Sequence, residues 1–355
     1  MKNTASSSFD VTAFNAALSA WYSKSARVMP WRGTADPYRI WVAEVMLQQT
    51  TVVTVIPYYE RFMARFGDVQ SLAAADIEDV LALWQGLGYY RRARMLHACA
   101  KEVVSCELGV ESEGGWPRDV GGLMALPGIG PYTAAAIAAC AFDIPANVVD
   151  GNVERVVARL FKISTPLPAA KKGIFAAAGT LVNEAHPRIY ANAMMELGAT
   201  VCKPRNPKCE VCPVAAFCAL AGDETVDNYP VKVKKAARPV RSGVAYILMR
   251  EGDIFLRKRG DDGLLGGLWE CPNDGLPGAG LDGLTTMEYE EMGVVRHVFT
   301  HFTLELEVRK VERCDVSMGG LGEGGWFGEE DLPPLPTLMR KVLKVGVIRE
   351  HAADL

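Results

Sequence analysis

The sequence predicts two regions of different fold class: a mainly α-helical region over residues 9–226 and a smaller α+β domain over 243–355. Apolar residues recur with the 3.6-residue period of helices up to about residue 220, and with the two-residue period of strands beyond 243. Residues 227–242 between them are polar, basic and interrupted by proline, which is typical of a linker. We expect residues 1–8 to form a disordered tail.

Helical periodicity predicts the elements of the first region, and glycine, proline and capping residues separate them. The pattern is found in the stretches 14–24, 38–66, 77–87, 91–105, 132–142 and 151–161. In the second region, residues 243–259 predict a β-hairpin with its turn at Glu251, Gly252 and Asp253. Residues 294–313 predict two further strands or one bent strand, and residues 335–347 predict a closing helix.

Charge and composition limit the classes of function. The 355-residue chain has a net charge of −4, and residues 243–355 carry 12 basic and 20 acidic side chains. An acidic protein is a poor default candidate for nucleic-acid binding, so such a function must be supported by local groups of residues. No apolar run is long enough to span a membrane and no secretion signal is visible, so we expect an intracellular protein.

Four cysteines lie close together in the sequence and predict a metal centre. They are Cys202, Cys209, Cys212 and Cys218, in the spacing C-x6-C-x2-C-x5-C. Structural zinc sites usually take two close cysteine pairs, whereas iron–sulfur clusters accept irregular spacing. Spacing alone therefore favours a cluster and leaves zinc open. We expect the other cysteines to be packing residues, namely Cys99, Cys106, Cys140, Cys271 and Cys314.

The stretch LPGIGPYTAAA contains a glycine-rich hairpin, residues 126–132, at the start of a helix. Gly128 and Gly130 allow the backbone to approach a ligand closely, and a helix N-terminus favours a phosphate. An ordinary helix–turn–helix loop is the alternative. Asp150, in the stretch VVDGNVERV, stands immediately before another helix, where it can serve as an N-cap, as a catalytic group or as both.

Glu44 is the one acid within the apolar stretch IWVAEVML. A carboxyl group among apolar side chains should have a raised pKa, because burial disfavours its charged form. A proton donor that works near neutral pH needs that property. The alternative is a structural residue that forms an ion pair, for example with Arg39.

The hairpin followed by an aspartate resembles the helix-hairpin-helix superfamily of DNA glycosylases, and the cysteine spacing is similar to that superfamily's 4Fe-4S loop, here residues 202–218. Within the superfamily, residues 20–220 look like the adenine DNA glycosylase (MutY) family, which removes adenine mispaired with 8-oxoguanine. The motifs that carry this resemblance are PWR, DPY.IWVAEVMLQQT, GLGYYRRARMLH, LPGIGPYTAAA, VDGNVERV and NAMMELGA. The resemblance implies one 4Fe-4S cluster as cofactor.

The resemblance also implies catalytic roles. Bifunctional relatives carry a catalytic lysine at the position of Tyr132, and a phenol cannot form the imine that strand cleavage requires. We therefore expect a monofunctional glycosylase of base excision repair. Glu44 would protonate the adenine, and Asp150 would stabilise the cationic sugar left behind. Asn152 and Tyr132 would orient these two carboxyl groups, while Gly128 and Gly130 would bind the DNA backbone.

Further residues correspond to the family's substrate contacts. Trp31 and Arg32 would line the adenine pocket, and Asn192 stands where relatives carry Gln or Glu facing the base. A wedge of four residues would fill the space near 8-oxoguanine, namely Gln49, Thr50, Leu87 and Tyr89. Helix or loop surface, or core packing for Leu87, is the alternative for these four.

The second domain resembles the MutT-like (Nudix-like) domain of this family through the stretch GLLGGLWECP. It lacks the dense carboxylate helix of a pyrophosphohydrolase, so we do not expect independent nucleotide hydrolysis. Its HVFTHF stretch matches the family's 8-oxoguanine loop, and Phe299, Thr300 and His301 would contact that base. The expected partner is double-stranded DNA that contains A:8-oxoguanine or A:G mispairs. We expect the protein to be a monomer in the bacterial cytoplasm that associates with the nucleoid when it acts.

Two other functions remain open at this stage. A bifunctional glycosylase for pyrimidine lesions would form a covalent complex that borohydride traps, which Tyr132 argues against. A non-catalytic lesion-binding or redox-sensing protein built on the cluster is the other, and the pair Glu44 and Asp150 argues against it.

Overall fold

A computed structural model describes residues 9–105, 112–113, 115–233, 237–260, 263–277, 281, 284–285, 287–312 and 321–347. The chain forms two compact units, Met1–Ala74 with Met95–Lys235, and Ala75–Arg94 with Ala236–Leu355. The second unit thus takes in residues 75–94, which the sequence places in the 9–226 region. The predicted tail, Cys106, Cys314 and part of the linker lie outside the described residues.

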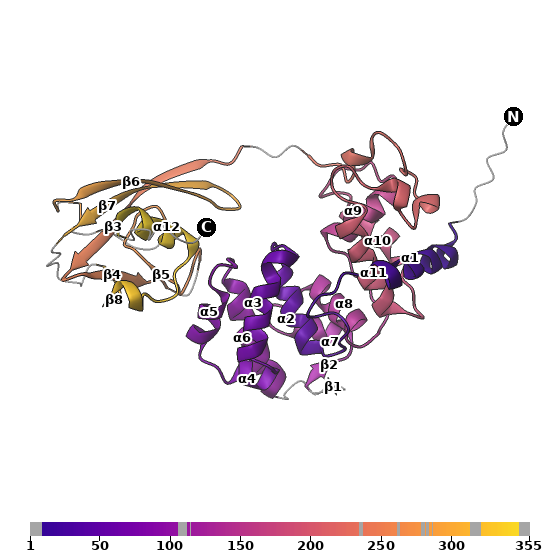
Figure 1. Cartoon of the computed structure of the whole chain (residues 1–355), viewed down its shortest axis with the longest axis horizontal. Coiled ribbons are helices and arrows are strands. Elements are labelled where there is room, and N and C mark those ends of the chain that lie inside the picture. The colour runs from indigo at the N-terminus through magenta and orange to yellow at the C-terminus, as the bar shows by residue number, and fades with distance from the viewer. Residues whose placement is uncertain are drawn as a thin grey trace. The chain divides into compact units, whose positions relative to one another are not determined.

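The first unit is helical, as predicted (Figure 1). Its helices are α1 (Val11–Ser25), α2 (Pro37–Leu47), α3 (Val52–Arg65), α4 (Val69–Ala73), α7 (Val120–Ala125), α8 (Pro131–Cys140), α9 (Gly151–Leu160), α10 (Lys171–Gly179), α11 (Pro187–Thr200) and most of α6 (Arg91–Ser105). Two short strands, β1 (Ser112–Glu113) and β2 (Trp116–Pro117), pair between α6 and α7.

The continuous apolar pattern over 38–66 forms two helices rather than one. Gln49 adopts a positive φ of 59°, which an α-helix cannot contain. Thr51 then caps α3, since its side chain accepts a hydrogen bond from the backbone of Thr54. Local capping chemistry therefore overrides the continuous periodicity.

The cores of the first unit bring together the helices that carry the predicted motifs. Helix α8 is buried along nearly its whole length and packs against α2, α7 and α11. Helix α9 packs between α10 and α11, and its apolar residues join those of α1 in one core. The hairpin, the predicted acid and the predicted aspartate are therefore all anchored in packed helices.

The second unit contains helix α5 (Ile77–Trp84) and an α+β fold. Its strands are β3 (Val240–Arg250), β4 (Asp253–Lys258), β5 (Trp269–Glu270), β6 (Glu290–Val298), β7 (Thr303–Val311) and β8 (Gly324–Phe327). The sheet order is β5-β4-β3-β7-β6, with β8 paired to β4. Strands β3 and β7 are parallel and the other pairs are antiparallel. Helix α12 (Thr337–Gly346) packs on β6, β7 and β3.

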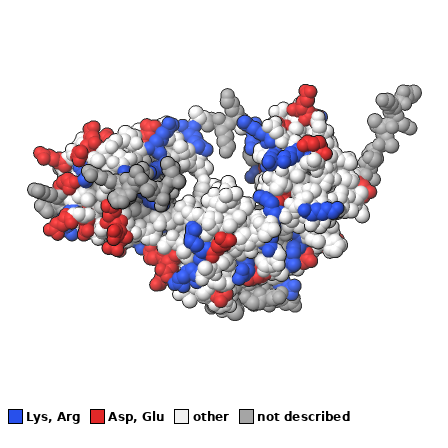
Figure 2. All heavy atoms as spheres, viewed as in Figure 1, with Lys and Arg blue, Asp and Glu red and all other residues white. Residues whose placement is uncertain are grey.

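The predicted hairpin of β3 and β4 and the closing helix are confirmed, and residues 294–313 contribute to two strands. Strand β3 begins at Val240, inside the predicted linker. Glu290 and Glu291 lie on β6 and not on a helix. Acidic side chains are prominent on the visible face of the β-rich unit (Figure 2). Among the described residues, no helix is long and apolar enough to cross a membrane.

Candidate active site and cluster site

Glu44 lies on the buried helix α2. The side chain of Asp36 caps the helix, and Pro37 occupies its first position, where no backbone N–H is needed. Every residue from Ile40 to Met46 is buried, and Glu44 itself is only 7% exposed. Arg39, the ion-pair partner that the sequence offers, lies 3.5 Å from Asp36 instead. The alternative interpretation of Glu44, a structural residue that forms an ion pair with Arg39, therefore lacks its expected partner.

The surroundings of Glu44 suit a proton donor. Burial raises its pKa to about 7, the hydrogen bond from Tyr132 opposes this rise, the negative charge of Asp150 adds to it, and Arg32 opposes it. A carboxylic acid with a pKa near 7 keeps a large protonated fraction at neutral pH. The effect of Asp150 on Glu44 also indicates that the two predicted carboxyl groups share one neighbourhood.

Tyr132 connects the glycine hairpin to Glu44. It lies in the first turn of α8, and its hydroxyl donates a hydrogen bond of 2.6 Å to Oε2 of Glu44. The same hydroxyl lies 3.5 Å from Sδ of Met195 on α11. Burial, followed by the negative charges of Glu44 and Asp150, raises the pKa of Tyr132 well above its ordinary value. Tyr132 is therefore a neutral hydrogen-bond donor near neutral pH.

The two glycines of the hairpin meet different requirements. Gly128 has a positive φ of 74°, and a Cβ there would come within 2.5 Å of Cβ of Met95. Gly128 is thus required by the fold itself. Gly130 caps α8, and a Cβ there would meet no atom within 4 Å. The open space over Gly130 leaves the start of α8 accessible to a phosphate.

Asp150 caps α9, and its negative charge acts on Glu44. One of its oxygens accepts hydrogen bonds from the backbone N–H groups of Asn152 and Val153, at 2.9 and 2.7 Å. The other accepts a hydrogen bond of 2.7 Å from Nδ2 of Asn152. Burial raises the pKa of Asp150 above its ordinary value, although these hydrogen bonds oppose it. Asp150 is therefore a cap whose orientation is fixed by Asn152.

A cavity of about 240 Å³ lies beside Glu44. Three further residues from the sequence prediction line it, namely Trp31, Arg32 and Asn192. Sequence reasoning missed the other lining residues, which are Tyr22, Gly33, Thr34, Ile40, Cys140, Arg188 and Ile189. The cavity combines apolar walls with a few polar groups and a titratable acid, as ligand sites commonly do.

Glu196 on α11 holds Arg32 at this cavity. Glu196 is fully buried and accepts hydrogen bonds from Arg27 at 2.6 Å and from Arg32 at 2.7 Å. Burial acts to raise the pKa of Glu196, but the hydrogen bonds from the two arginines outweigh it and leave the pKa below its ordinary value. The sequence prediction missed Glu196. Its signal was the same as for Glu44, a single acid within an apolar run, here AMMELGA.

The four predicted wedge residues lie in two turns. Gln49 is exposed with a positive φ, and Thr50 follows it between α2 and α3. Leu87 lies in the turn after α5 and is only 6% exposed, so in this structure it packs inside the protein. Tyr89 is 51% exposed and has a positive φ of 49°. Gln49 and Tyr89 thus adopt backbone conformations that cost energy for residues other than glycine.

The HVFTHF stretch covers the end of β6 and the turn that leads to β7. Phe299 stacks on Phe302 at 4.8 Å, and its backbone N–H bonds to the carbonyl of Phe302. Thr300 and His301 are exposed at the tip of this turn. Within the second unit, the hydroxyl of Tyr89 lies 3.4 Å from Oγ1 of Thr300. The structure thus brings Tyr89 together with one of the three predicted 8-oxoguanine contacts.

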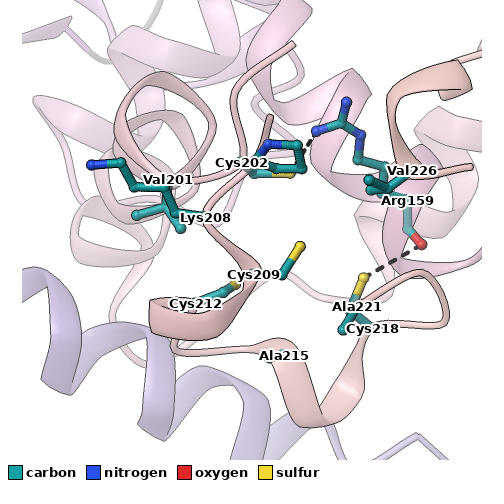
Figure 3. Close-up of a pocket in the computed structure, with 11 residues that line it drawn as sticks. Arg159, Val201, Cys202, Lys208, Cys209, Cys212, Ala215, Cys218, Ala221 and Val226 are labelled. Atoms are coloured by element: carbon teal, nitrogen blue, oxygen red, sulfur yellow. Dashed lines mark hydrogen bonds between the residues drawn. The ribbon is translucent and has the colours of Figure 1, made fainter. Parts of the chain in front are cut away.

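The four cysteines of the 202–218 loop line one pocket with Arg159 (Figure 3). Arg159 on α9 is 1% exposed, and its Nη1 lies 3.4 Å from Sγ of Cys202. The thiol of Cys218 donates to the carbonyl oxygen of Arg159 at 3.6 Å. Arg159 also donates to the carbonyl groups of Lys203, Pro204 and Tyr229. One buried arginine therefore joins the cysteine loop to α9, the helix that Asp150 caps.

The chemistry of this pocket fits an iron–sulfur cluster. Burial raises the pKa of Cys212 to about 11 and raises that of Cys218, so bare thiols would stay protonated there. Iron supplies the positive charge that stabilises thiolates. Among the described residues, no group of three or more His, Cys, Asp or Glu side chains could hold a single metal ion.

Arg155 links the cluster loop to Asp150, the aspartate that caps α9. Its Nη2 donates to Oδ1 of Asn152 at 2.9 Å, and its Nε donates to the carbonyl oxygen of Cys202 at 2.8 Å. Asn152 in turn donates to Asp150. Arg155 and Arg159 stand one turn apart on the mostly buried helix α9, and the prediction from sequence did not use them.

The fold and the site together define a DNA glycosylase with a hairpin and a cluster loop, and comparisons with known proteins agree. Residues 42–177 match the HhH-GPD superfamily of base excision DNA repair proteins. Residues 202–218 match the iron-sulfur binding domain of endonuclease III, and residues 243–345 match the NUDIX domain. Cys202, Cys209, Cys212 and Cys218 bind one 4Fe-4S cluster.

Particular relatives identify the family. The adenine DNA glycosylase of Mus musculus is 35% identical over 95% of this chain and 78% of its own length. The adenine DNA glycosylase of Buchnera aphidicola subsp. Baizongia pistaciae is 31% identical over 80% of this chain and 82% of its own length. A thermostable thymine-DNA glycosylase of known structure aligns with a TM-score of 0.53 and 29% identity, over 60% of this chain and 96% of that chain. The chain belongs to the adenine DNA glycosylase family of base excision repair, and its substrate is DNA.

Proposed function

We propose that the enzyme hydrolyses the N-glycosidic bond of adenine opposite 8-oxoguanine or guanine, and that Glu44 is its general acid. The target adenine must leave the base stack and enter a pocket, and the cavity beside Glu44 offers that space. Adenine departs poorly until its ring is protonated. Glu44, with a pKa near 7, transfers its proton to N7 of the adenine. The single observation that supports this role best is the burial of Glu44 together with its hydrogen bond of 2.6 Å from the hydroxyl of Tyr132.

Asp150 stabilises the sugar as the bond breaks. The electrons of the bond between C1′ and N9 leave with the adenine, and the deoxyribose becomes cationic. The carboxylate of Asp150 is held by Asn152 and by the start of α9, so it needs no rearrangement to face that charge. Glu44, now ionised, accepts a proton from the water that attacks C1′. Tyr132 keeps Glu44 oriented through both steps.

Tyr132 makes the enzyme monofunctional. Strand cleavage by related enzymes needs an amine that attacks C1′, and the phenol of Tyr132 cannot form an imine. Burial further restricts Tyr132 to the role of a hydrogen-bond donor, because it raises the pKa of the phenol. The reaction therefore ends at an abasic site with both strands intact.

Recognition of the opposite base belongs to the second unit. The exposed tip of the turn between β6 and β7 carries Thr300 and His301, above the stacked rings of Phe299 and Phe302. The hydroxyl of Thr300 is suited to the N7–H or the 8-oxo group that distinguishes 8-oxoguanine from guanine. Tyr89 supports Thr300 in this arrangement. In the first unit, Gln49 and Thr50 lie in the turn between α2 and α3 and contact the bent duplex. We further propose that the enzyme acts as a monomer in the bacterial cytoplasm.

The proposal is tested by product analysis on a duplex with one A:8-oxoguanine pair. We expect release of free adenine, strands that break only after alkali, and no complex trapped by borohydride. Strand cleavage without alkali, or a trapped complex, would instead indicate the bifunctional mechanism. Binding without any base release would indicate a non-catalytic lesion-binding protein. An A:T duplex is the substrate control, and its adenine should be released much more slowly.

A variant tests the recognition loop separately. Thr300→Val keeps the shape of the side chain and removes its hydroxyl. We expect the ratio of rates on A:8-oxoguanine and A:G duplexes to fall, since one hydrogen bond to the 8-oxo base is lost. Thr180→Val, at an exposed position after α10, is the matched control and should leave the ratio unchanged. An unchanged ratio in Thr300→Val would remove Thr300 from the recognition site.

A further inference from the structure

Two exposed cations lie near the recognition turn, residues 299–302, and the proposed mechanism does not use them. They are Arg241 at the start of β3 and Lys341 on α12. Among the described residues, neither forms an ion pair. Carboxylate groups pair instead with Arg257, Lys258, Arg259, Arg296, Arg309 and Lys310. The charges of Arg241 and Lys341 are therefore available to an anion from outside the protein.

The sheet places Arg241 beside the recognition turn. Arg241 of β3 pairs with Leu304 of β7, and Leu304 pairs with His297 of β6. Residues directly opposite each other in a sheet point to the same face. Leu304 shares a core with apolar residues of α12, so this is the face that α12 covers. Arg241 therefore lies on the side of the sheet that carries α12 and Lys341, close to the turn that joins β6 to β7.

The aromatic rings under the turn hold Arg241 in place. The guanidinium carbon of Arg241 lies 4.2 Å from the centre of the Phe302 ring, and Phe302 stacks on Phe299 at 4.8 Å. The negative face of an aromatic ring attracts a cation in this position. The contact uses none of the guanidinium N–H groups, and among the described residues none of them donates a hydrogen bond. Arg241 is thus positioned in advance, with its donors available to an anion.

Lys341 lies by the other end of this row of rings. His297 forms an edge-to-face contact with Phe299, and the two ring centres are 4.7 Å apart. Burial, followed by the positive charge of Lys341, lowers the pKa of His297. Nζ of Lys341 also donates a hydrogen bond of 3.3 Å to the carbonyl oxygen of Arg296. The rings under the recognition turn therefore have Lys341 at one end and Arg241 at the other.

We propose that Arg241 and Lys341 bind the two phosphate groups that flank 8-oxoguanine, on the strand that carries this base. The inference rests on the proposed function, in which the recognition turn reads 8-oxoguanine. Phosphate groups are the anions nearest to any base that the turn contacts, since every nucleotide of the strand carries one. Arginine can bind a phosphate through two parallel hydrogen bonds, and lysine binds it as a point charge.

These contacts explain how an acidic domain approaches DNA. Residues 243–355 carry 12 basic and 20 acidic side chains, so the domain as a whole repels the phosphate backbone. The end of the sheet with Arg241 and Lys341 meets the backbone with positive charge instead. Contacts to phosphate fix the position of a protein on the duplex without reading the sequence. Selectivity for 8-oxoguanine therefore stays with the recognition turn, and the two cations supply affinity and orientation.

The first experiment measures how the dissociation constant of the DNA complex depends on salt concentration. The duplex pairs 8-oxoguanine with 2′-fluoroarabinoadenosine, whose fluorine destabilises the cationic sugar, so that the base stays attached. The native protein is compared with Arg241→Gln, Lys341→Gln and the matched control Arg250→Gln. Arg250 is exposed at the other end of β3, and its guanidinium carbon also lies 4.2 Å from a ring centre, that of Trp326. Thermal melting establishes that each variant is folded.

In a plot of log Kd against log salt concentration, we expect the slope to fall by about 0.9 in Arg241→Gln and in Lys341→Gln, because each phosphate contact releases about that number of counterions. Arg250→Gln removes the same charge and the same kind of ring contact, and it should keep the native slope. A native slope in Arg241→Gln or in Lys341→Gln would overturn the assignment of that residue.

The second experiment identifies the strand. A methylphosphonate replaces one phosphate with a neutral group, either beside 8-oxoguanine or beside the adenine analogue in the other strand. At one of the two positions that flank 8-oxoguanine, it should weaken binding by the native protein and by Arg250→Gln about 10-fold, which corresponds to one hydrogen bond to a charged group. The same substitution should not weaken binding by Arg241→Gln further. If Arg241→Gln instead loses the penalty of a substitution beside the adenine analogue, the strand assignment is wrong.

Failure of this inference and failure of the proposed function are distinguishable. If the native protein releases adenine from the A:8-oxoguanine duplex but all four proteins share one slope, the two cations do not bind phosphate and the proposed function stands. If the native protein releases no adenine, the proposed function fails and this inference fails with it. Arg241 and Lys341 lie on different elements, so either variant decides the question even if the other does not fold.

Discussion

The hydroxyl of Tyr132 donates a hydrogen bond of 2.6 Å to Oε2 of Glu44, across 88 residues of sequence. This contact joins the glycine hairpin to the proposed acid. It also tunes that acid, because the bond favours the charged form of Glu44 while burial favours the neutral form. The outcome is a carboxyl group with a pKa near 7, as a general acid needs.

We predict that the single-turnover rate falls as the pH rises through about 7, because Glu44 then loses the proton it must donate. Tyr132→Phe removes the hydrogen bond that lowers the pKa of Glu44. The pKa should therefore rise, and the alkaline fall in rate should move to higher pH. Tyr58→Phe, on the neighbouring helix α3, should leave the profile unchanged. A fall that moves to lower pH in Tyr132→Phe would contradict this account of the pair.

Stability should also depend on the protonation of Glu44. Its pKa is about 7 in the folded protein against 4.5 as its ordinary value, so the folded state binds the proton more tightly. The resulting stabilisation is complete below pH 4.5 and is lost as the pH rises through 7. Between pH 4.5 and 8, the free energy of unfolding of Glu44→Gln should rise by about 3 kcal/mol relative to that of the native protein. Thermal melting across this range measures the gain. Glu60→Gln, an exposed change on α3, should show no such trend.

Asp150→Asn should separate the two functions of Asp150. Asparagine caps helices about as well as aspartate, so the melting temperature should change little. The charge that stabilises the sugar is lost, and the rate of adenine release should fall on the order of 10²- to 10³-fold. Asp119→Asn, at the cap of α7, is the matched control and should change neither. A native rate in Asp150→Asn would show that Asp150 is only a cap.

The fold class, the family and the cofactor were all predicted from the sequence, and the structure and the comparisons confirm them. The reason is local: the hairpin, the helix caps and the cysteine spacing are each encoded within a few residues. Short helices such as α4 and α7 were not predicted, since five or six residues give too little periodicity to detect. The division at Gln49 was missed because capping, not hydrophobicity, ends α2.

The site was predicted only where a motif carried it. For Glu44, the sequence could not decide between Arg39 and an apolar pocket, because the deciding partner, Tyr132, is distant in sequence. Glu196 and Arg188 were missed for the same reason. Each acts through contacts with segments more than 40 residues away, such as Arg32 or Asp143. Spacing within one segment cannot reveal such contacts.

Loss of one cluster ligand should unfold the loop around Arg159. We expect Cys209→Ser to reduce the iron and sulfide content of the purified protein and to lower its melting temperature, because four thiolates hold the cluster. Cys99→Ser, at a buried cysteine of α6, should retain full iron and sulfide even if packing suffers. Full iron content in Cys209→Ser, or zinc in place of iron in the native protein, would contradict the assignment of the cluster.

The most direct test of the central claim is the single-turnover release of adenine from an A:8-oxoguanine duplex by the native protein and by Glu44→Gln, with Glu60→Gln as control. Glutamine keeps the size of Glu44 and cannot donate the proton. We predict that Glu44→Gln binds the duplex as tightly as the native protein and releases adenine about 10²- to 10⁴-fold more slowly, while Glu60→Gln stays at the native rate. Adenine release by Glu44→Gln at the native rate would contradict the assignment of Glu44 as the acid.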